Sequence, residues 1–335
     1  MNKQRLEDFE LGPVIGSGTV GTIYSAVMKS SGETVAIKLL QLAVSKDKLV
    51  KARFAREMEI LQRLHHPNII NYFGGGEHKG QLFFAMELID GGTVRDLLER
   101  FGSLSWQEVA SCGRQICSGL QYAHNHGIIH RDLKPSNLFL ARTGELKLGD
   151  FGIARDINSA DITMTGLTVG THSYMPPEQI TGSPHIDGKA DLYSLGCVLF
   201  EMLTGRKPFQ ADNFAHLFEQ HLHAPPPRVR EFAPDCPQQM DDIVDQLLEK
   251  KPEQRPFNAR AVQGVMLQLL AADAPHPERG DRDVAAAAII DPGQERLTRK
   301  LTMENAASQV SWTRLVMLVT ITIVVIAVAA FFSSK

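Results

Sequence analysis

GIIHRDLKPSNLFLARTGELKLGDFG, residues 127–152, is the stretch of sequence that decides the fold. Short apolar runs alternate here with polar residues and are bounded by glycine or proline, which predicts small buried strands joined by tight loops. Carboxylates, an amide and cations lie between these runs, at His130, Arg131, Asp132, Lys134, Asn137, Lys147 and Asp150. Carboxylate and amide oxygens held in loops around a rigid hairpin suit a site for magnesium and phosphate.

A glycine-rich segment precedes this stretch, where Gly16, Gly18 and Gly21 form the pattern G-x-G-x-x-G. A dinucleotide-binding turn would need a helix directly after the last glycine, but residues 22–27 alternate with the period of a strand. The glycines therefore predict the tip of a hairpin, whose backbone can lie close over phosphate oxygens. An ordinary hairpin turn without a ligand remains the alternative on this motif alone.

Residues 34–40 predict the next strand. Side chains alternate between the faces of a strand, so Val35, Ile37 and Leu39 share one face, and Ala36 and Lys38 share the other. A lysine beside a small alanine suits the wall of a nucleotide site. A lysine on a solvated strand face is the alternative.

Residues 46–64 predict a helix whose apolar stripe consists of Phe54, Met58, Leu61 and Leu64. Glu57 falls within that stripe, and a carboxylate facing inward is costly unless a cation pairs with it. Lys38 is the expected partner. Glu59 is the rival candidate for this contact, but its spacing from the following His-Pro-Asn fits less well.

Taken together, these motifs resemble the eukaryotic-type (Hanks-type) serine/threonine protein kinases, and in particular the bacterial membrane-anchored members. The resemblance rests on VAIK at 35–38, HRDL followed by Asn137, DFG at 150–152, PPE at 176–178 and DLYSLG at 191–196. It covers residues 9–270. It implies an α+β, two-lobed kinase fold, with a small β-rich N-lobe at about 9–88 and a large helical C-lobe at about 89–270.

The resemblance also implies roles for the polar residues. Asp132 would accept or orient the proton of the substrate hydroxyl, and Lys134 would neutralise charge on the transferred phosphoryl group. Lys38 would pair with the α- and β-phosphates of ATP. Asn137 and Asp150 would hold Mg²⁺, with Mn²⁺ as an alternative ion. Lys134 directly after the HRDL motif favours serine and threonine over tyrosine as substrates.

ATP would lie between the two lobes. Residues 82–89 predict a buried strand leading to the hinge, with Met86 as gatekeeper and with the backbone of Glu87 and Ile89 on the adenine. The full expected ATP-binding set is Ile15, Gly16, Ser17, Gly18, Thr19, Val20, Gly21, Ile23, Ala36, Lys38, Glu57, Met86, Glu87 and Ile89.

Residues 153–177 resemble an activation segment with three candidate phosphosites, Thr163, Thr165 and Thr168. Surface threonines without this role are the alternative. By resemblance, Arg131 would receive a phosphate on this segment, which orders it through charge-assisted hydrogen bonds. The remaining expected contacts are structural: Thr171 with the catalytic loop, a buried pair of Glu178 with Arg255, and Asp191 as an anchor for the catalytic-loop backbone.

Composition excludes several other classes of protein. A net charge of −3 gives no indication of a nucleic-acid partner. The four cysteines form no C-x-x-C pair and are too sparse for a disulfide framework, so buried, reduced thiols are expected. The histidines at 65–66, 124 and 126 have no cysteine or acid at ligand spacing, which argues against a zinc site.

The C-terminal region changes in composition. Residues 271–313 predict a juxtamembrane linker that is mostly disordered, with one short helix near 285–290. Residues 314–332 predict a transmembrane helix, because 315–332 carry no charge and would span roughly 27 Å as a helix. Residues 333–335 form a short tail. More cations precede the segment than follow it, which places the kinase domain in the cytoplasm, and the resemblance suggests the bacterial plasma membrane.

Two other functions stay open at this point. One is a membrane-tethered pseudokinase that binds partners without transferring phosphate, and the other is a kinase of small molecules or lipids. The intact chemical positions argue against the first, and the peptide-presenting activation segment argues against the second. The expected partners are ATP, protein substrates, the membrane and a transient homodimer.

Overall fold

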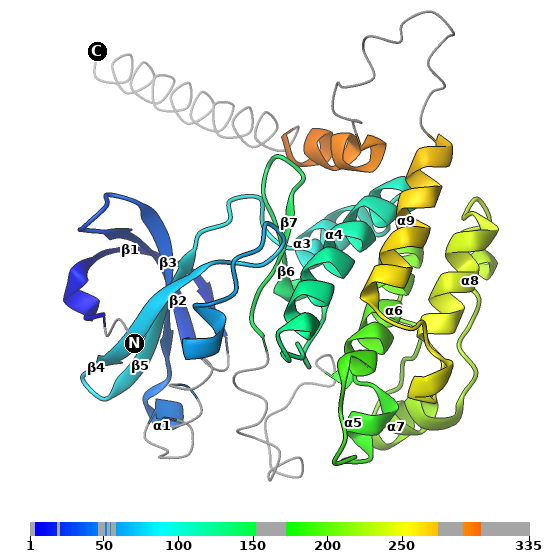
Figure 1. The fold of residues 1–335 in the computed structure, drawn as a ribbon, viewed down its shortest axis with the longest axis horizontal. Coiled ribbons are helices and arrows are strands. Elements are labelled where there is room, and N and C mark those ends of the chain that lie inside the picture. Colours follow the sequence, from blue (N-terminus) through cyan, green and yellow to red (C-terminus); the bar gives the residue numbers. More distant parts are fainter. Residues whose placement is uncertain are drawn as a thin grey trace, which may run out of the picture.

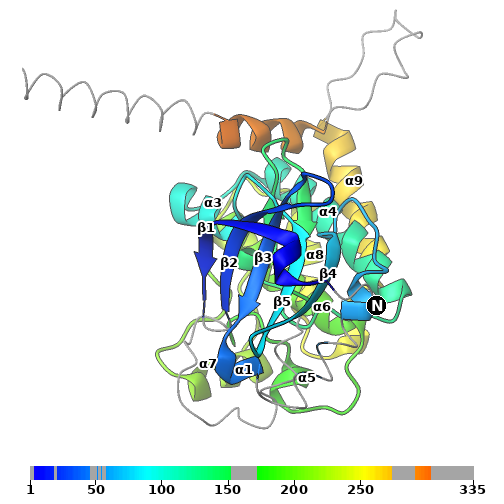
Figure 2. The same cartoon turned by 90° about the vertical axis from the view of Figure 1, so that its left-hand side faces the viewer.

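The structure is a computed structural model, and it describes residues 4–18, 21–45, 51, 54, 58–151, 172–273 and 291–302. The N-lobe contains an antiparallel sheet of five strands in the order β1-β2-β3-β5-β4, and Figure 2 looks onto this sheet. Its elements are η1 (Leu6–Asp8), β1 (Phe9–Ser17), β2 (Gly21–Met28), β3 (Thr34–Leu40), β4 (Tyr72–His78) and β5 (Gln81–Glu87).

The two faces of β3 pack as its alternation predicts. Val35 and Ile37 are fully buried with Phe9 and Phe83 in a small cluster on one face of the sheet. Ala36 packs on the other face, in the main core that continues into the C-lobe. The predicted bounds of this strand, 34–40, are confirmed.

A helical segment follows β3. The short α1 (Leu42–Ser45) comes first, and residues 51, 54 and 58–61 are helical among those described. The predicted stripe is confirmed, because Phe54, Met58, Leu61 and Leu64 are all buried. Glu57, which the sequence places on this stripe, lies outside the described residues.

The C-lobe is helical and lies beside the sheet (Figure 1). Helix α4 has the bounds that its periodicity predicts, and α6 runs through the lobe with most of its residues buried. The helices are α3 (Val94–Phe101), α4 (Trp106–Asn125), α5 (Pro177–Ile180), α6 (Gly188–Thr204), α7 (Phe214–His223), α8 (Gln238–Leu247) and α9 (Ala259–Asp273). The 3-10 turns are η2 (Pro135–Asn137), η4 (Val229–Glu231) and η5 (Pro252–Gln254).

The deciding stretch forms the hairpin that its short apolar runs predict. Strand β6 (Leu138–Leu140) pairs antiparallel with β7 (Leu146–Leu148), and the leucines at both ends of each strand are buried. The polar residues therefore fall in the loops before β6 and after β7. This hairpin joins the two lobes, because Ile70 donates its backbone N–H to the Leu148 carbonyl.

The C-terminal region differs from expectation in one place. Residues 292–302 form a helix that lies on the C-lobe, where a mostly disordered linker is predicted, and Leu297 and Leu301 are buried in the main core. The short helix predicted near 285–290 and the predicted transmembrane segment 314–332 lie outside the described residues. Among the residues that are described, no helix has the length and apolar character needed to cross a membrane.

Candidate active site

The catalytic loop brings three of the predicted residues together. Lys134 Nζ lies 2.8 Å from Asp132 Oδ2, and Asn137 Nδ2 donates to the backbone carbonyl of Asp132 at 2.8 Å and to its Oδ2 at 3.2 Å. The side chains of Asp132 and Lys134 are only 17% and 20% exposed. The carboxylate is therefore held by two donors while one edge still faces solvent.

Asp191, at the N-terminal end of α6, fixes the backbone of this loop. Its two carboxylate oxygens accept the backbone N–H groups of His130 and Arg131, each at 2.8 Å. Arg131 has a positive φ of 61°, a conformation that costs a non-glycine residue energy and that surrounding contacts must enforce. The buried carboxylate of Asp191 supplies that constraint.

The protonation of this buried group is controlled by its neighbours. Burial by itself would raise the pKa of Asp191, but the hydrogen bonds from the His124 ring and from the backbone N–H of His130 contribute to lowering it overall. His124 Nε2 lies 2.7 Å from Asp191 Oδ2. Burial lowers the pKa of His130, whose Nε2–H donates to the Gly149 carbonyl at 3.1 Å and whose ring centroid lies 4.6 Å from that of Phe151. His130 is therefore a neutral packing residue.

Lys38 and Asp150 meet across the cleft between the lobes. Lys38 Nζ lies 2.8 Å from both carboxylate oxygens of Asp150, and the two side chains are 16% and 27% exposed. Asp150 has a positive φ of 49°. Lys38 also lies 5.8 Å above the Phe84 ring. The expected partner Glu57 lies outside the described residues, so Asp150 is the carboxylate that the structure brings to Lys38.

The hinge follows β5. Met86 is paired with Ala36 across the sheet, so the gatekeeper and the expected adenine-facing alanine are direct neighbours. The backbone N–H of Glu87 donates to the Asn71 carbonyl, which leaves its carbonyl oxygen as the group it could offer to adenine. The Glu87 side chain pairs with Lys147 of β7 at 2.9 Å, and this ion pair ties the hinge to the C-lobe hairpin.

The glycine-rich hairpin joins β1 to β2. Gly16 pairs with Ile23 and Ser17 with Thr22, while Ile15 is 49% exposed. Gly21 has no room for a side chain, since a Cβ there would lie 2.3 Å from the Leu39 carbonyl oxygen. Gly18 has open space around it. The tip residues Thr19 and Val20 lie outside the described residues.

Glu178 and Arg255, which the sequence expects to pair, form two parallel hydrogen bonds of 2.7 and 2.9 Å. The Arg255 side chain is fully buried, and its remaining donors reach the carbonyls of residues 189, 249 and 250. A buried guanidinium with this many partners is a structural group. The predicted sites Gly152, Thr163, Thr165, Thr168 and Thr171 lie outside the described residues.

Three contacts at the site were not predicted from the sequence. They are His124 with Asp191, Lys147 with Glu87, and Lys38 with Asp150. Each joins residues at least sixty positions apart, and periodicity carries no information on such pairs. The only available signal was chemical, because an aspartate at the start of an apolar helix needs a donor when it is buried.

The side-chain oxygens of Asn137 and Asp150 suit a divalent metal ion that is also bound by nucleotide phosphates. Asn137 turns its NH₂ group toward Asp132, while its oxygen accepts a 3.5 Å hydrogen bond from Ser136 Oγ and is the atom that a metal ion would contact, and Asp150 supplies a carboxylate. Mg²⁺ is usually bound by one or two protein oxygens together with phosphates and water. No group of three or more histidine, cysteine or acidic side chains in the described part of the chain could bind a metal ion on its own. The four cysteines are free and buried, as expected.

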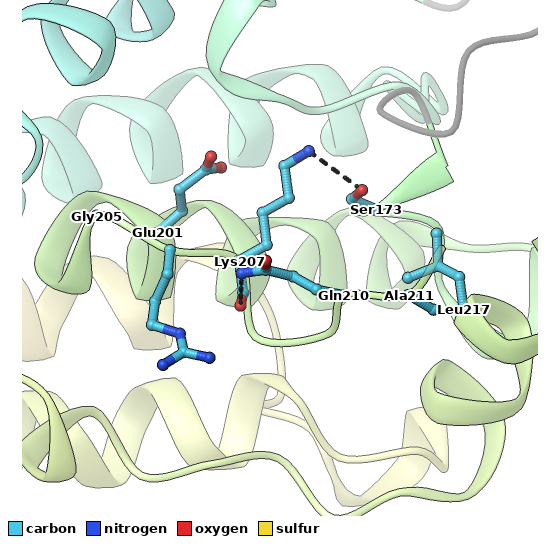
Figure 3. A pocket seen from close by; sticks show the side chains of 8 residues that line it. Ser173, Glu201, Gly205, Lys207, Gln210, Ala211 and Leu217 are labelled. Atoms are coloured by element: carbon cyan, nitrogen blue, oxygen red, sulfur yellow. Dashed lines mark hydrogen bonds between the residues drawn. The ribbon is translucent and has the colours of Figure 1, made fainter. Parts of the chain in front are cut away.

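A separate pocket of about 400 Å³ lies beside α6, away from this cleft (Figure 3). Glu201, in the last turn of α6, and Lys207, just after this helix, project in the same direction, and Lys207 Nζ is 3.3 Å from Ser173 Oγ. Burial raises the pKa of Glu201, although its hydrogen bond with Tyr174 opposes that rise. The pocket therefore has an acidic and a basic side chain, Glu201 and Lys207, beside Ser173.

Comparison with known proteins agrees with this geometry. The family described as "Protein kinase domain" matches residues 9–266. A probable serine/threonine-protein kinase of Streptomyces coelicolor is 38% identical over 253 residues, which are 74% of this chain and 37% of that protein. Serine/threonine-protein kinase PknJ of Mycobacterium tuberculosis is 38% identical over 248 residues, covering 72% of this chain and 42% of PknJ.

A third relative extends further along the chain. Serine/threonine-protein kinase PknD of Mycobacterium tuberculosis is 34% identical over 291 residues, covering 85% of this chain and 44% of PknD. The chain thus spans about two fifths of the length of the curated relatives it matches. With most of its length matched, and with a β-sheet N-lobe and a helical C-lobe in place, the chain belongs to the protein kinase domain family, in its bacterial serine/threonine branch.

Proposed function

We propose that this chain is an ATP-dependent serine/threonine protein kinase that uses Mg²⁺ and transfers the γ-phosphoryl group to hydroxyls of proteins. The observation that carries the proposal is the cluster of Asp132, Lys134 and Asn137, in mutual contact and partly exposed on a loop fixed by Asp191. Together with Lys38 and Asp150 it supplies a carboxylate for the hydroxyl, cations for phosphate charge and oxygens for a metal ion.

Each group has one task in this proposal. Asp132 accepts a hydrogen bond from the substrate hydroxyl and orients its oxygen toward phosphorus. Lys134 moves from Asp132 onto the transferred group, where negative charge builds up. Lys38 exchanges Asp150 for phosphate oxygens when nucleotide binds. Asn137 and Asp150 would hold Mg²⁺, which would supply positive charge to the triphosphate.

The test is phosphate transfer by the full chain in detergent. Incubation with Mg²⁺ and γ-labelled ATP should label the chain or a generic acceptor protein on serine or threonine, identified by mass spectrometry. Lys38→Met should remove the labelling. If the wild-type chain binds ATP but labels neither itself nor any acceptor, the chain is a pseudokinase scaffold and the proposal fails.

We further propose that activation follows autophosphorylation of the segment between PPE and DFG, in a transient homodimer. Arg131 lies on the catalytic loop, where a cation can receive a phosphate and so order that segment. Thr163→Ala combined with Thr165→Ala should lower activity by about tenfold or more without weakening ATP binding. Full activity in this double variant would reject the switch, and Thr168→Ala then tests the remaining candidate.

We also propose that residues 314–332 anchor the chain in the bacterial plasma membrane, with the kinase domain on the cytoplasmic side, where ATP is available. The support is the uncharged run 315–332 and the cations that precede it. Val324→Arg with Ile326→Arg should move the chain from the membrane fraction to the soluble fraction, since each arginine opposes insertion by roughly 2.5–3.5 kcal/mol. Val324→Leu with Ile326→Leu is the matched control and should stay in the membrane.

A further inference from the structure

The helix at residues 292–302 lies on a surface that fits it closely. Leu297 and Leu301 point into the main core and are 0% and 3% exposed. Apart from Pro292 in its first turn, they are the only aliphatic side chains of this helix, and the charged residues Glu295 and Arg296 face solvent. The apolar face is narrow, yet it is covered completely by the C-lobe.

Polar contacts fix both ends of the helix. At its start, Asp291 Oδ2 accepts from Ser111 Oγ at 2.8 Å and from Arg114 Nη2 at 3.1 Å, while Oδ1 accepts the N–H groups of Gly293 and Gln294. One carboxylate therefore caps the helix and ties it to α4. The side chain of Asp291 is 12% exposed.

Near its C-terminal end, Lys300 Nζ reaches Glu108 Oε2 at 2.9 Å and lies 5.0 Å above the Phe101 ring. Glu108 is only 2% exposed, and a carboxylate this deeply buried needs a cation or several donors. Its other donors are Ser105 N–H and Oγ at the start of α4.

Two glycines allow the close contact between this helix and the C-lobe, because a side chain at either position would clash. A Cβ on Gly293 would lie 2.1 Å from the Gln107 carbonyl oxygen, so only glycine lets the helix approach α4 this closely. A Cβ on Gly144, in the β6–β7 turn, would lie 2.8 Å from the Gln294 carbonyl oxygen. Gln294 Nε2 also donates to the Thr143 carbonyl at 3.2 Å. The helix therefore bridges α4 and the β6–β7 turn.

We propose that residues 291–302 are a docking helix that seats on α4 and the β6–β7 turn of the same chain and so shortens the tether to the membrane. This rests on the proposed anchor at 314–332. With the helix docked, only residues 303–313 join the folded domain to the anchor, and they reach at most about 40 Å. Without docking, residues 274–313 join them and reach about 140 Å.

The shorter tether has a consequence for position. Figures 1 and 2 both draw the docking helix at one end of the C-lobe and helices α5 and α7 at the opposite end. A docked helix keeps the α4 end near the bilayer. The opposite end, which carries Glu178 of the PPE motif, then points toward the cytosol, where protein substrates arrive.

The first test measures docking in the full chain. Leu297→Ala with Leu301→Ala removes the buried face, and Arg296→Ala changes an exposed side chain of the same helix as the control. Hydrogen exchange should be slow over residues 294–302 in the wild type and in the control. It should be faster by roughly 100-fold in the double variant, while α6 keeps its protection. Fast exchange over this helix in the wild-type chain would overturn the proposal.

The second test measures position in nanodiscs of phosphatidylcholine and phosphatidylglycerol that contain spin-labelled lipid. Because the four native cysteines are buried, a thiol dye labels an introduced cysteine at Glu145→Cys, in the β6–β7 turn, or at His185→Cys, after α5. Stronger quenching at 145 than at 185, with a smaller difference in the double leucine variant, is the expected result. Equal quenching in the wild type would overturn the tether.

Flotation of the chain with the nanodiscs separates this proposal from the anchor. If the chain does not float with the lipid, the anchor fails and the tether fails with it, whereas the exchange result still decides docking. If the chain floats and the helix is protected, but the two dyes report the same depth, docking stands and the shortened tether is wrong.

Discussion

Two groups of charged residues in the C-lobe and cleft are held in different ways. The buried network is the name for two separate pairs, His124 with Asp191 and Glu178 with Arg255, and the cleft cluster comprises the pairs of Lys38 with Asp150 and of Lys134 with Asp132. Asp191 and Arg255 have no exposed side-chain surface and several hydrogen bonds each, whereas the cleft side chains are 16–27% exposed.

The difference indicates which charges belong to stability and which to chemistry. A buried charge is tolerated only when its partners are complete, so removing one partner leaves the other uncompensated. The cleft pairs lie nearer solvent, and in the proposed function a nucleotide, a metal ion or a substrate replaces one partner of each pair. Substitutions in the network should therefore lower stability, and those in the cleft should lower activity alone.

Asp132→Asn should have the largest effect. An amide keeps the size of the side chain but cannot accept the hydroxyl proton, so kcat should fall by about 10³-fold. The thermal midpoint should stay within about 2 °C of the wild type, because the contact with Lys134 is partly exposed. Phosphotransfer rates and thermal unfolding measure the two quantities, and Asp235→Asn, at an exposed aspartate, is the control. If Asp132→Asn retains activity within tenfold of the wild type, the conclusion that the cleft residues serve chemistry is wrong.

Arg255→Met should have the largest effect on stability. It leaves Glu178 without its cation in a buried position, which should lower the free energy of unfolding by about 3–5 kcal/mol. Urea unfolding measures the loss. Arg95→Met, which breaks the exposed pair of Arg95 with Glu99, is the matched control and should cost less than about 0.5 kcal/mol. Equal losses in the two variants would mean that burial does not set the difference.

The pH dependence of stability at His221 tests the effect of burial on a titratable group. Its ring contacts Tyr193, on which Arg255 also stacks, and burial followed by the charge of Lys250 lowers its pKa to about 3. In the unfolded chain His221 takes up a proton with the ordinary histidine pKa near 6.5, whereas in the folded chain it stays neutral down to about pH 3. Stability from this group is complete above pH 6.5 and falls by about 1.4 kcal/mol per pH unit as the pH drops toward 3.

Between pH 7 and pH 5 the wild type should therefore lose about 2 kcal/mol more than His221→Gln, which cannot take up the proton. Urea midpoints at the two pH values give the difference. Other acid-sensitive groups, such as His130, remain in both proteins and cancel. Equal losses would mean that His221 is protonated in the folded state.

The sequence predicts the elements of this fold better than the contacts between them. The bounds of α4 and β3 follow from strong periodicity, and the motif spacing places Asp132, Asn137 and Asp150 around one hairpin. The pairing of Lys38 with Asp150 joins positions 112 residues apart, and many partners for a lysine look equally good in sequence.

The docking helix is an element that the sequence did not predict. Residues 292–302 are mostly polar, and two leucines in a charged stretch give too weak a stripe to outweigh a linker-like composition. Their burial depends on a surface made by α4 and the β6–β7 turn, which exists only after the C-lobe has folded. Composition describes a segment in isolation and therefore cannot report such a surface.

Glu59 gives the smallest expected effect and separates two candidates for the partner of Lys38. Its side chain is 58% exposed and pairs with Arg63 one turn later, so Glu59→Gln should cost less than about 0.5 kcal/mol and leave activity unchanged. If Glu57 is the partner, Glu57→Gln should instead lower kcat/KM about tenfold or more, since it weakens a charged hydrogen bond that positions Lys38, the lysine proposed to bind phosphate. The reverse pattern would require Glu59 to turn inward from a solvated pair, and the buried stripe of Met58 and Leu61 would have to rotate with it. Four apolar positions define the inward face of this helix. The two variants therefore test whether the glutamate on that face, Glu57, is the one that functions.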